Sequence, residues 1–169
     1  MKRYKIIFKY DGSSFYGFQT QKNKRCVESE IDKVLSKINN KNTHIVACSR
    51  TDKGVHALGQ VGHVDLDTDI LPHKLKHALN SYLPDDIYVT EVEEVNENFH
   101  SRYDAIEKTY KYYINLAEYN PMQRNYIFQY NYKLDIEAMR NAGKYLIGEH
   151  DFRSFATDST DKNCNRTIP

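Results

Sequence analysis

Apolar and polar side chains alternate along several short segments of the chain, and two longer segments carry apolar residues at helical spacing. The alternation over residues 3–10, ended by the turn pair Asp11-Gly12, predicts a half-buried strand. Apolar residues that recur every three or four positions predict a helix over residues 27–39. The remaining predicted elements are strands over residues 44–49, 60–66 and 87–95 and a helix that begins near Pro72 and carries its apolar stripe to Leu83.

The predicted order of elements in residues 1–98 is βαββαβ, the order of the ferredoxin-like (RRM-like) α+β fold. In that fold an antiparallel sheet carries both helices on one face. We therefore expect a ferredoxin-like N-terminal domain over residues 1–98, with the second face of its sheet open for binding.

A second α/β unit is expected over residues 99–169. Alternating side chains predict a long strand over residues 108–116 and a shorter one over residues 126–130. Asp135 is a suitable N-cap for a helix over residues 136–146. This unit shows a strand and a helix but not the other strands and second helix of the first unit, so we expect an incomplete domain of similar type that the chain leaves unfinished.

Composition excludes several classes of protein but names no function. Of the 169 residues, 40% are apolar and 28% are charged, so wholesale disorder is not expected. No apolar run approaches the roughly 20 residues of a spanning helix, and residues 1–10 do not resemble a secretory signal, so we expect no membrane partner. Three widely spaced cysteines, Cys26, Cys48 and Cys164, indicate a reducing, cytoplasmic location without a disulfide or zinc framework.

The formal net charge of +1 hides an uneven distribution of charged residues. Residues 1–25 carry seven basic side chains against the single acid Asp11, whereas residues 85–97 carry six acids and no base. A basic stretch can hold a polyanion with an affinity that falls as salt rises, but charge alone favours an ordinary solvated surface. The asymmetry becomes informative only where it lies near a candidate site.

The loop over residues 50–57, with the sequence RTDKGVHA, links two predicted strands and carries the candidate chemistry. Thr-Asp-x-Gly by itself is common in structural turns. Arg50 could form a bidentate pair with a carboxylate and keep it ionised, and Asp52 would then be a positioned nucleophile or base. His56 is either a general base or a hydrogen-bonded structural residue.

This loop resembles the active-site signature of the TruA family of tRNA pseudouridine synthases, whose usual form is GRTDxGVHA; here Ser49 replaces the leading glycine. Five further motifs are similar to the family and follow in the same order. They are YDGSSFYGFQ at residues 10–19, FHSRY and KTYKY at residues 99–103 and 108–112, GEHDFRSF at residues 148–155 and RTI at residues 166–168. Because these motifs span nearly the whole chain, it is identified as a member of this family.

The resemblance implies an isomerase that converts uridine to pseudouridine at positions 38, 39 and 40 of the tRNA anticodon stem-loop, with no metal and no organic cofactor. It implies that Asp52 is the catalytic carboxylate, acting either on C1′ or on a ribose proton. It gives Tyr110 the role of the tyrosine that stacks on the target base, which must leave its own stack to be reached. Arg50 would organise Asp52 and the displaced nucleotide.

The substrate-binding residues expected from the same motifs are Arg102, Phe18, Gln19 and His56, and several candidates have structural alternatives. Tyr110 is otherwise a half-buried sheet tyrosine. Phe15, Tyr16 and Phe18 either stack on bases or anchor their loop on the core. Arg102 either contacts RNA or pairs with an acid such as Asp104. The basic stretch flanks this loop, so we expect it to contact phosphates.

The resemblance also implies a homodimer that binds one tRNA, with each active site between two similar domains. In the family the second domain supplies a basic partner for the catalytic aspartate, and the matching segments would lie after Pro169. We therefore expect these 169 residues to have little or no activity alone. The alternatives are a non-catalytic tRNA- or RNA-binding module, an inactive paralogue, and an Asp-dependent hydrolase, which lacks a second carboxylate near Asp52.

Overall fold

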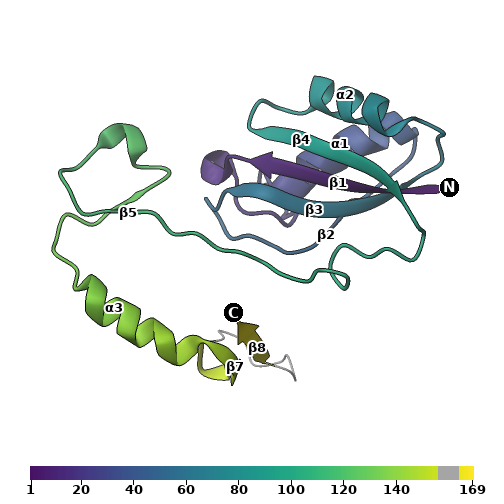
Figure 1. The fold of residues 1–169 in the computed structure, drawn as a ribbon. Helices are drawn as coiled ribbons and strands as arrows, with labels where there is room; N and C mark the ends of the chain where they lie inside the picture. The colour runs from purple at the N-terminus through teal and green to yellow at the C-terminus, as the bar shows by residue number, and fades with distance from the viewer. Residues whose placement is uncertain (156–163) are drawn as a thin grey trace. The chain divides into compact units, whose positions relative to one another are not determined.

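The computed structural model describes residues 1–155 and 164–169 and divides into two compact units, Met1–Lys111 and Tyr112–Pro169 (Figure 1). The first unit is an α+β structure built on a four-stranded antiparallel sheet. Its elements are β1 (Lys2–Tyr10), a 3-10 turn (Gly12–Ser14), α1 (Val27–Asn39), β2 (Val46–Ala47), β3 (Ala57–Leu66), α2 (Pro72–Tyr82) and β4 (Ile87–Val95). The strands are joined in the order β2-β3-β1-β4, so β1 and β3 are central.

One face of this sheet forms the core of the first unit. The side chains of Tyr4, Ile6, Phe8 and Tyr10, at every second position of β1, are each at most 4% exposed. They share one hydrophobic cluster with the apolar stripes of both helices, which are Val27, Ile31, Val34 and Leu35 from α1 and Leu75 and Leu79 from α2. Every second side chain of a strand points to the same face of the sheet, and here these side chains pack against the apolar stripe of each helix. Both helices therefore cover the same face.

Most elements predicted over residues 1–98 are confirmed, and α1 and β4 have the predicted bounds. β2 is shorter than the strand predicted over residues 44–49. One reason is that Ile45 N–H donates to Asp32 Oδ1 of α1 (2.8 Å) and so does not take part in the sheet. β3 begins earlier than predicted, at Ala57, which pairs with Tyr10 at the end of β1.

The second face of the sheet is partly covered by the segment that follows β4. The guanidinium of Arg3 in β1 forms a bidentate pair with the carboxylate of Asp65 in β3, with two hydrogen bonds of 2.7 Å. It also donates to the carbonyl of Phe99 (2.9 Å). His63 of β3 and Ser101 are only 5% and 3% exposed. The face that was expected to be open is therefore closed where residues 99–103 lie over it.

The second unit consists of short elements. They are β5 (Ile114–Asn115), β6 (Phe128–Gln129), α3 (Ile136–Gly143), β7 (Gly148–Asp151), β8 (Asn165–Ile168) and 3-10 turns at Pro121–Gln123, Lys144–Leu146 and Arg153–Phe155. β5 pairs with β6 in parallel, and β7 pairs with β8 antiparallel. Asp135 caps α3 as predicted, because its Oδ1 accepts from Ala138 N–H (2.9 Å). Among the described residues of this unit only Cys164 is buried.

The long strand predicted over residues 108–116 is wrong. Within the described parts of the chain, only Ile114 and Asn115 of this segment pair with another strand, β6, whose Phe128 N–H also donates to the carbonyl of Tyr113 (2.8 Å). Residues 108–112 form no backbone hydrogen bond with a described strand, and Tyr110 and Tyr112 are 66% and 90% exposed. Alternation gives a segment two faces, but a strand forms only where a neighbour pairs with it.

No helix in the described ranges is both long enough and apolar enough to cross a membrane. Cys26, Cys48 and Cys164 are buried, and they form no disulfide with one another.

We expect Leu35→Ala to lower the free energy of unfolding by about 2–5 kcal/mol, because Leu35 is fully buried between α1 and the sheet. Leu58→Ala removes the same atoms from a side chain that is 79% exposed, so its effect should stay within about 0.5 kcal/mol. Urea unfolding of both variants measures the difference. Equal effects would contradict the assignment of the core.

Candidate active site

Backbone hydrogen bonds join the RTDKGVHA loop to the aromatic loop over residues 13–21. Phe18 N–H donates to the carbonyl of Thr51 (2.9 Å), and Gly54 N–H donates to the carbonyl of Phe15 (3.3 Å). The Thr51 hydroxyl also lies 2.8 Å from the hydroxyl of Tyr10 at the end of β1. These bonds, called the loop seam below, hold the backbone on both sides of Asp52.

Two glycines allow the loops to approach this closely. A Cβ on Gly12 would lie 2.0 Å from the carbonyl oxygen of Val55, a distance that real Cβ atoms do not reach. Gly17 has a φ of +102°, which side chains rarely allow, and a Cβ there would lie 2.9 Å from the carbonyl oxygen of Thr51. The backbones of the YDGSSFYGFQ and RTDKGVHA motifs thus pack directly against each other.

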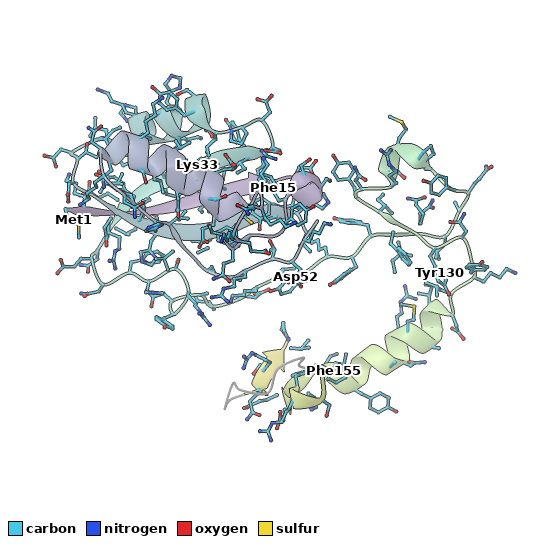
Figure 2. All side chains as sticks on the ribbon, turned by 180° about the vertical axis from the view of Figure 1, so that it is seen from behind. Met1, Phe15, Lys33, Asp52, Tyr130 and Phe155 are labelled. Atoms are coloured by element: carbon cyan, nitrogen blue, oxygen red, sulfur yellow. The ribbon has the colours of Figure 1, made fainter. Side chains whose placement is uncertain are left out.

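Asp52 and Arg50 are exposed on this rigid framework. Figure 2 shows Asp52 and Phe15 at the same end of the first unit, in agreement with the loop seam. Neither Arg50 nor Asp52 forms an ion pair or hydrogen bond through its side chain with the residues that the structure describes. The bidentate pair expected of Arg50 is not formed, and its role toward Asp52 stays a prediction.

His56 lies between the RTDKGVHA loop and the turn after β1. Its Nδ1 accepts from Gly12 N–H (3.1 Å) and lies equally close to Asp11 Oδ1 (3.1 Å). One nitrogen cannot accept from the amide and donate to the carboxylate at once, so the tautomer and charge of the ring decide which bond forms. Either bond ties the loop to the turn, which is the structural alternative for His56.

The aromatic loop separates its side chains into buried anchors and one exposed ring. Phe15 and Phe18 are 1% and 2% exposed, and Phe18 stacks on Phe8 with ring centroids 6.3 Å apart. Phe18 therefore anchors the loop in the core, and its ring is not available to stack on a base. Tyr16 is 41% exposed, and Gln19 is exposed as well.

Tyr110 and Arg102 lie in the irregular segment that follows β4. Lys108 Nζ donates to the carbonyl of Cys48 (3.2 Å), which attaches the segment of Tyr110 to the start of the RTDKGVHA loop. Tyr110 and Asp52 form no hydrogen bond with each other within the described part of the chain. Arg102 is exposed and does not pair with Asp104, whose carboxylate accepts from His100 N–H instead (2.8 Å).

The comparisons with known proteins agree with the motifs of this site. A sequence model of a family described as tRNA pseudouridine synthase matches residues 6–104. The chain belongs to this family. The resemblance seen in the sequence is thereby confirmed.

Curated relatives match the chain over nearly its whole length. The tRNA pseudouridine synthase A of Listeria monocytogenes (strain CLIP80459) is 46% identical over 96% of this chain and 66% of its own. The tRNA pseudouridine synthase A 2 of Bacillus anthracis is 43% identical over 96% and 67%, and the Thermosipho melanesiensis synthase A is 44% identical over 99% and 69%. The chain therefore spans about two thirds of the length of these tRNA pseudouridine synthases.

The uneven charge of this family member has a structural cause. β1 lies beside β4 and Arg25 lies beside Asp86, so the basic N-terminal stretch is partly neutralised by the acidic stretch. The pairs are Lys2–Glu94 (3.1 Å), Lys5–Glu93 (2.6 Å) and Arg25–Asp86 (2.6 Å). The paired bases are therefore less available to contact phosphates, the role expected of the whole stretch, which stays a prediction. Lys22 and Lys24 have no ion pair within the described ranges.

His63 and Ser101 hold the FHSRY segment of the family on the sheet, and the motifs alone did not reveal them. Ser101 N–H donates to His63 Nδ1 (3.2 Å), while the Ser101 hydroxyl donates to the carbonyl of Val46 (2.6 Å). Burial lowers the pKa of His63, and the nearby charges of Arg3 and His100 lower it further. A histidine at a sheet position that faces away from the core was the signal that could have identified it.

A cavity of about 230 Å³ lies away from the candidate residues. It is formed by the segment that leads into β2 and by β3, and it is lined by Lys41, Asn42, Thr43, His44, Val46, His63, Val64 and Asp65. Within the part of the chain that the structure describes, no three His, Cys, Asp or Glu side chains are grouped so that they could hold a metal ion. Asp52 is thus a carboxylate on an open, rigid loop.

Gly12→Ala should disturb the loop seam, because the new methyl group meets the backbone of Val55. We expect a loss of about 1–3 kcal/mol in the free energy of unfolding and shifted amide NMR signals over residues 51–56. Gly59→Ala is the matched control, since a Cβ on Gly59 meets nothing within 4 Å. Wild-type amide shifts in Gly12→Ala would show that the two loops are not in contact there.

The lowered pKa of His63 predicts a specific dependence of stability on pH. The folded protein binds the His63 proton more weakly than the unfolded chain does, so this residue destabilises the fold as pH falls below about 6.5 and ceases to do so as pH rises. His63→Asn keeps an acceptor for Ser101 N–H but cannot titrate.

Urea unfolding at several pH values between about 5 and 8 compares the two proteins on both sides of the ordinary histidine pKa. The free energy of the wild type should fall relative to that of His63→Asn toward pH 5. Subtraction of the variant removes the opposite contribution of His44, whose pKa is raised by its bond to Asp32. Parallel curves for the two proteins would rule out this role of His63.

Proposed function

We propose that this chain performs the chemistry of a tRNA pseudouridine synthase, isomerising uridine at positions 38, 39 and 40 of the anticodon stem-loop, with Asp52 as the catalytic carboxylate. The observation that carries this proposal is the sequence identity of 46% with the Listeria monocytogenes synthase A. The match covers 96% of the chain and includes the RTDKGVHA loop. The rigid and exposed presentation of Asp52 supports it, because a carboxylate can meet a flipped nucleotide only if both are accessible.

In the proposed reaction the bond between C1′ and N1 of the uridine breaks and a bond between C1′ and C5 forms. N1 gains a proton and C5 loses one, so the reaction is an isomerisation that needs no other reactant. Asp52 acts either by adding to C1′ or by removing a ribose proton. Tyr110 would stack on the base and handle the proton at C5, and Arg50 would orient Asp52. Arg102, Gln19 and His56 are the proposed substrate-binding residues.

We propose that the first unit is a ferredoxin-like, RRM-like domain. The element order β1-α1-β2-β3-α2-β4, the strand order β2-β3-β1-β4 and two helices on one face support this assignment. The domain boundary after residue 98 and the similarity of the second domain to the first stay predictions. The homodimer and the cytoplasmic location are likewise proposals by analogy with the family.

Two observations favour a second candidate function, which is tRNA binding without isomerisation. Asp52 has no basic partner among the described residues, and most apolar side chains of the second unit are exposed. A carboxylate that stays solvated is a weak nucleophile and a weak base. For this reason we expect the 169-residue chain to turn over far more slowly than the Listeria monocytogenes relative under the same conditions.

The deciding experiment measures tritium release from an anticodon stem-loop RNA labelled at C5 of uridine, with protein in excess, beside RNA binding by fluorescence anisotropy. We expect the chain to bind this RNA more tightly than an unrelated hairpin. Asp52→Asn should reduce release by at least about 10²-fold and leave the Kd within about twofold.

Asp69→Asn is the matched control, because Asp69 is a highly exposed acid whose substitution changes the net charge equally. Unchanged tritium release by Asp52→Asn would show that Asp52 is not the catalytic carboxylate. Binding without any release from excess protein would favour the non-catalytic function, and release at the rate of the relative would overturn the expectation of weak activity.

A further inference from the structure

Tyr16 holds two ammonium groups over its ring. Lys24 Nζ lies 4.3 Å and Lys53 Nζ 4.6 Å from the ring centroid, within the range of cation–π interactions. The two lysines come from different loops, and Lys53 directly follows Asp52 in the sequence. These three residues are called the Tyr16 cluster below.

The backbone that carries the Tyr16 cluster is fixed by hydrogen bonds. Tyr16 N–H donates to the carbonyl of Arg25 (2.9 Å), and the side-chain amide of Gln21 donates to the carbonyl of Tyr16 (2.8 Å). The loop seam holds the Lys53 side, because Gly54 N–H donates to the carbonyl of Phe15. The ring of Tyr16 is therefore a fixed support on which both lysines converge.

The positive charge of the Tyr16 cluster is not balanced by an acid. Lys24 and Lys53 have no carboxylate within ion-pair distance among the residues that the structure describes. Asp86 accepts both of its short bonds from Arg25, at 2.6 and 2.9 Å. Two like charges near one ring repel each other, and an anion bound beside them would relieve this repulsion.

We propose that the Tyr16 cluster binds a backbone phosphate of the RNA whose uridine is presented to Asp52. This assignment rests on the proposed function, which supplies the RNA. A phosphate accepts charge-assisted hydrogen bonds from both ammonium groups, and lysines already held against a ring lose less side-chain freedom on binding. A nucleotide that leaves its stack moves its phosphates as well, and a site beside Asp52 would fix that displaced backbone.

Salt-dependent RNA binding tests the two lysines. The Kd of a fluorescein-labelled anticodon stem-loop RNA is measured from about 50 to about 200 mM KCl for the chain, Lys24→Gln, Lys53→Gln and Lys22→Gln. Lys22 is an exposed lysine of the same region with no ring contact in the described part, so its substitution reports the general effect of lost charge. We expect Lys24→Gln and Lys53→Gln each to reduce the slope of log K against log [KCl] by about 0.7–0.9, and Lys22→Gln to change it much less.

Two substitutions of Tyr16 test the ring itself. Tyr16→Phe keeps the aromatic face and should bind RNA like the unsubstituted chain. Tyr16→Leu keeps an apolar side chain but removes the cation–π attraction, so it should weaken binding and diminish the additional effect of Lys24→Gln. Circular dichroism and thermal unfolding of each variant verify that the fold is retained.

The outcomes separate this inference from the proposed function. Slopes for Lys24→Gln and Lys53→Gln that equal that of Lys22→Gln, with RNA still bound, would overturn the phosphate site and leave the function untouched. Equal binding by Tyr16→Leu and Tyr16→Phe would overturn the role of the ring. If the unsubstituted chain does not bind the stem-loop RNA, the proposed function falls and the phosphate site falls with it.

Discussion

The candidate site depends on one constraint, the pairing of the aromatic loop with the RTDKGVHA loop through the loop seam. Phe15 and Phe18 fix the first loop in the core, and the carbonyl and amide groups beside these residues receive the second loop. Gly12 and Gly17 are required because any side chain there would separate the two backbones. Asp52 therefore owes its position to buried aromatic packing several bonds away, although its own side chain is exposed.

The sheet has a second effect on the site, because ion pairs on its surface neutralise lysines of β1. β4 lies beside β1 and places Glu94 and Glu93 next to Lys2 and Lys5, two of the seven bases of the N-terminal stretch. Exposed pairs of this kind contribute little stability, but they reduce the field of the sheet surface. Lys24 and Lys53, in the loops around Asp52, have no ion pair in the described part of the chain. A near-neutral protein can thus keep a local attraction for a polyanion.

The sequence predicted the elements of the first unit well, because their periodicity is set by a core that lies within the same 98 residues. α1 and β4 were predicted with their bounds, and the site loop was located by its motif. The contacts that the sequence could not predict join distant residues, such as Phe18 with Thr51 and His63 with Ser101. The strand predicted over residues 108–116 failed for the same reason, because alternation does not specify a pairing partner.

An exposed Asp52 is compatible with catalysis if the substrate completes its surroundings. In water a carboxylate is strongly solvated, and its reactivity rises only when that solvation is replaced by fixed partners. The first unit supplies position without such partners in its described part, since Arg50 is near in sequence but unpaired. The proposed division of roles follows: the loop seam fixes where the carboxylate stands, and the bound nucleotide supplies the dehydrated environment in which it reacts.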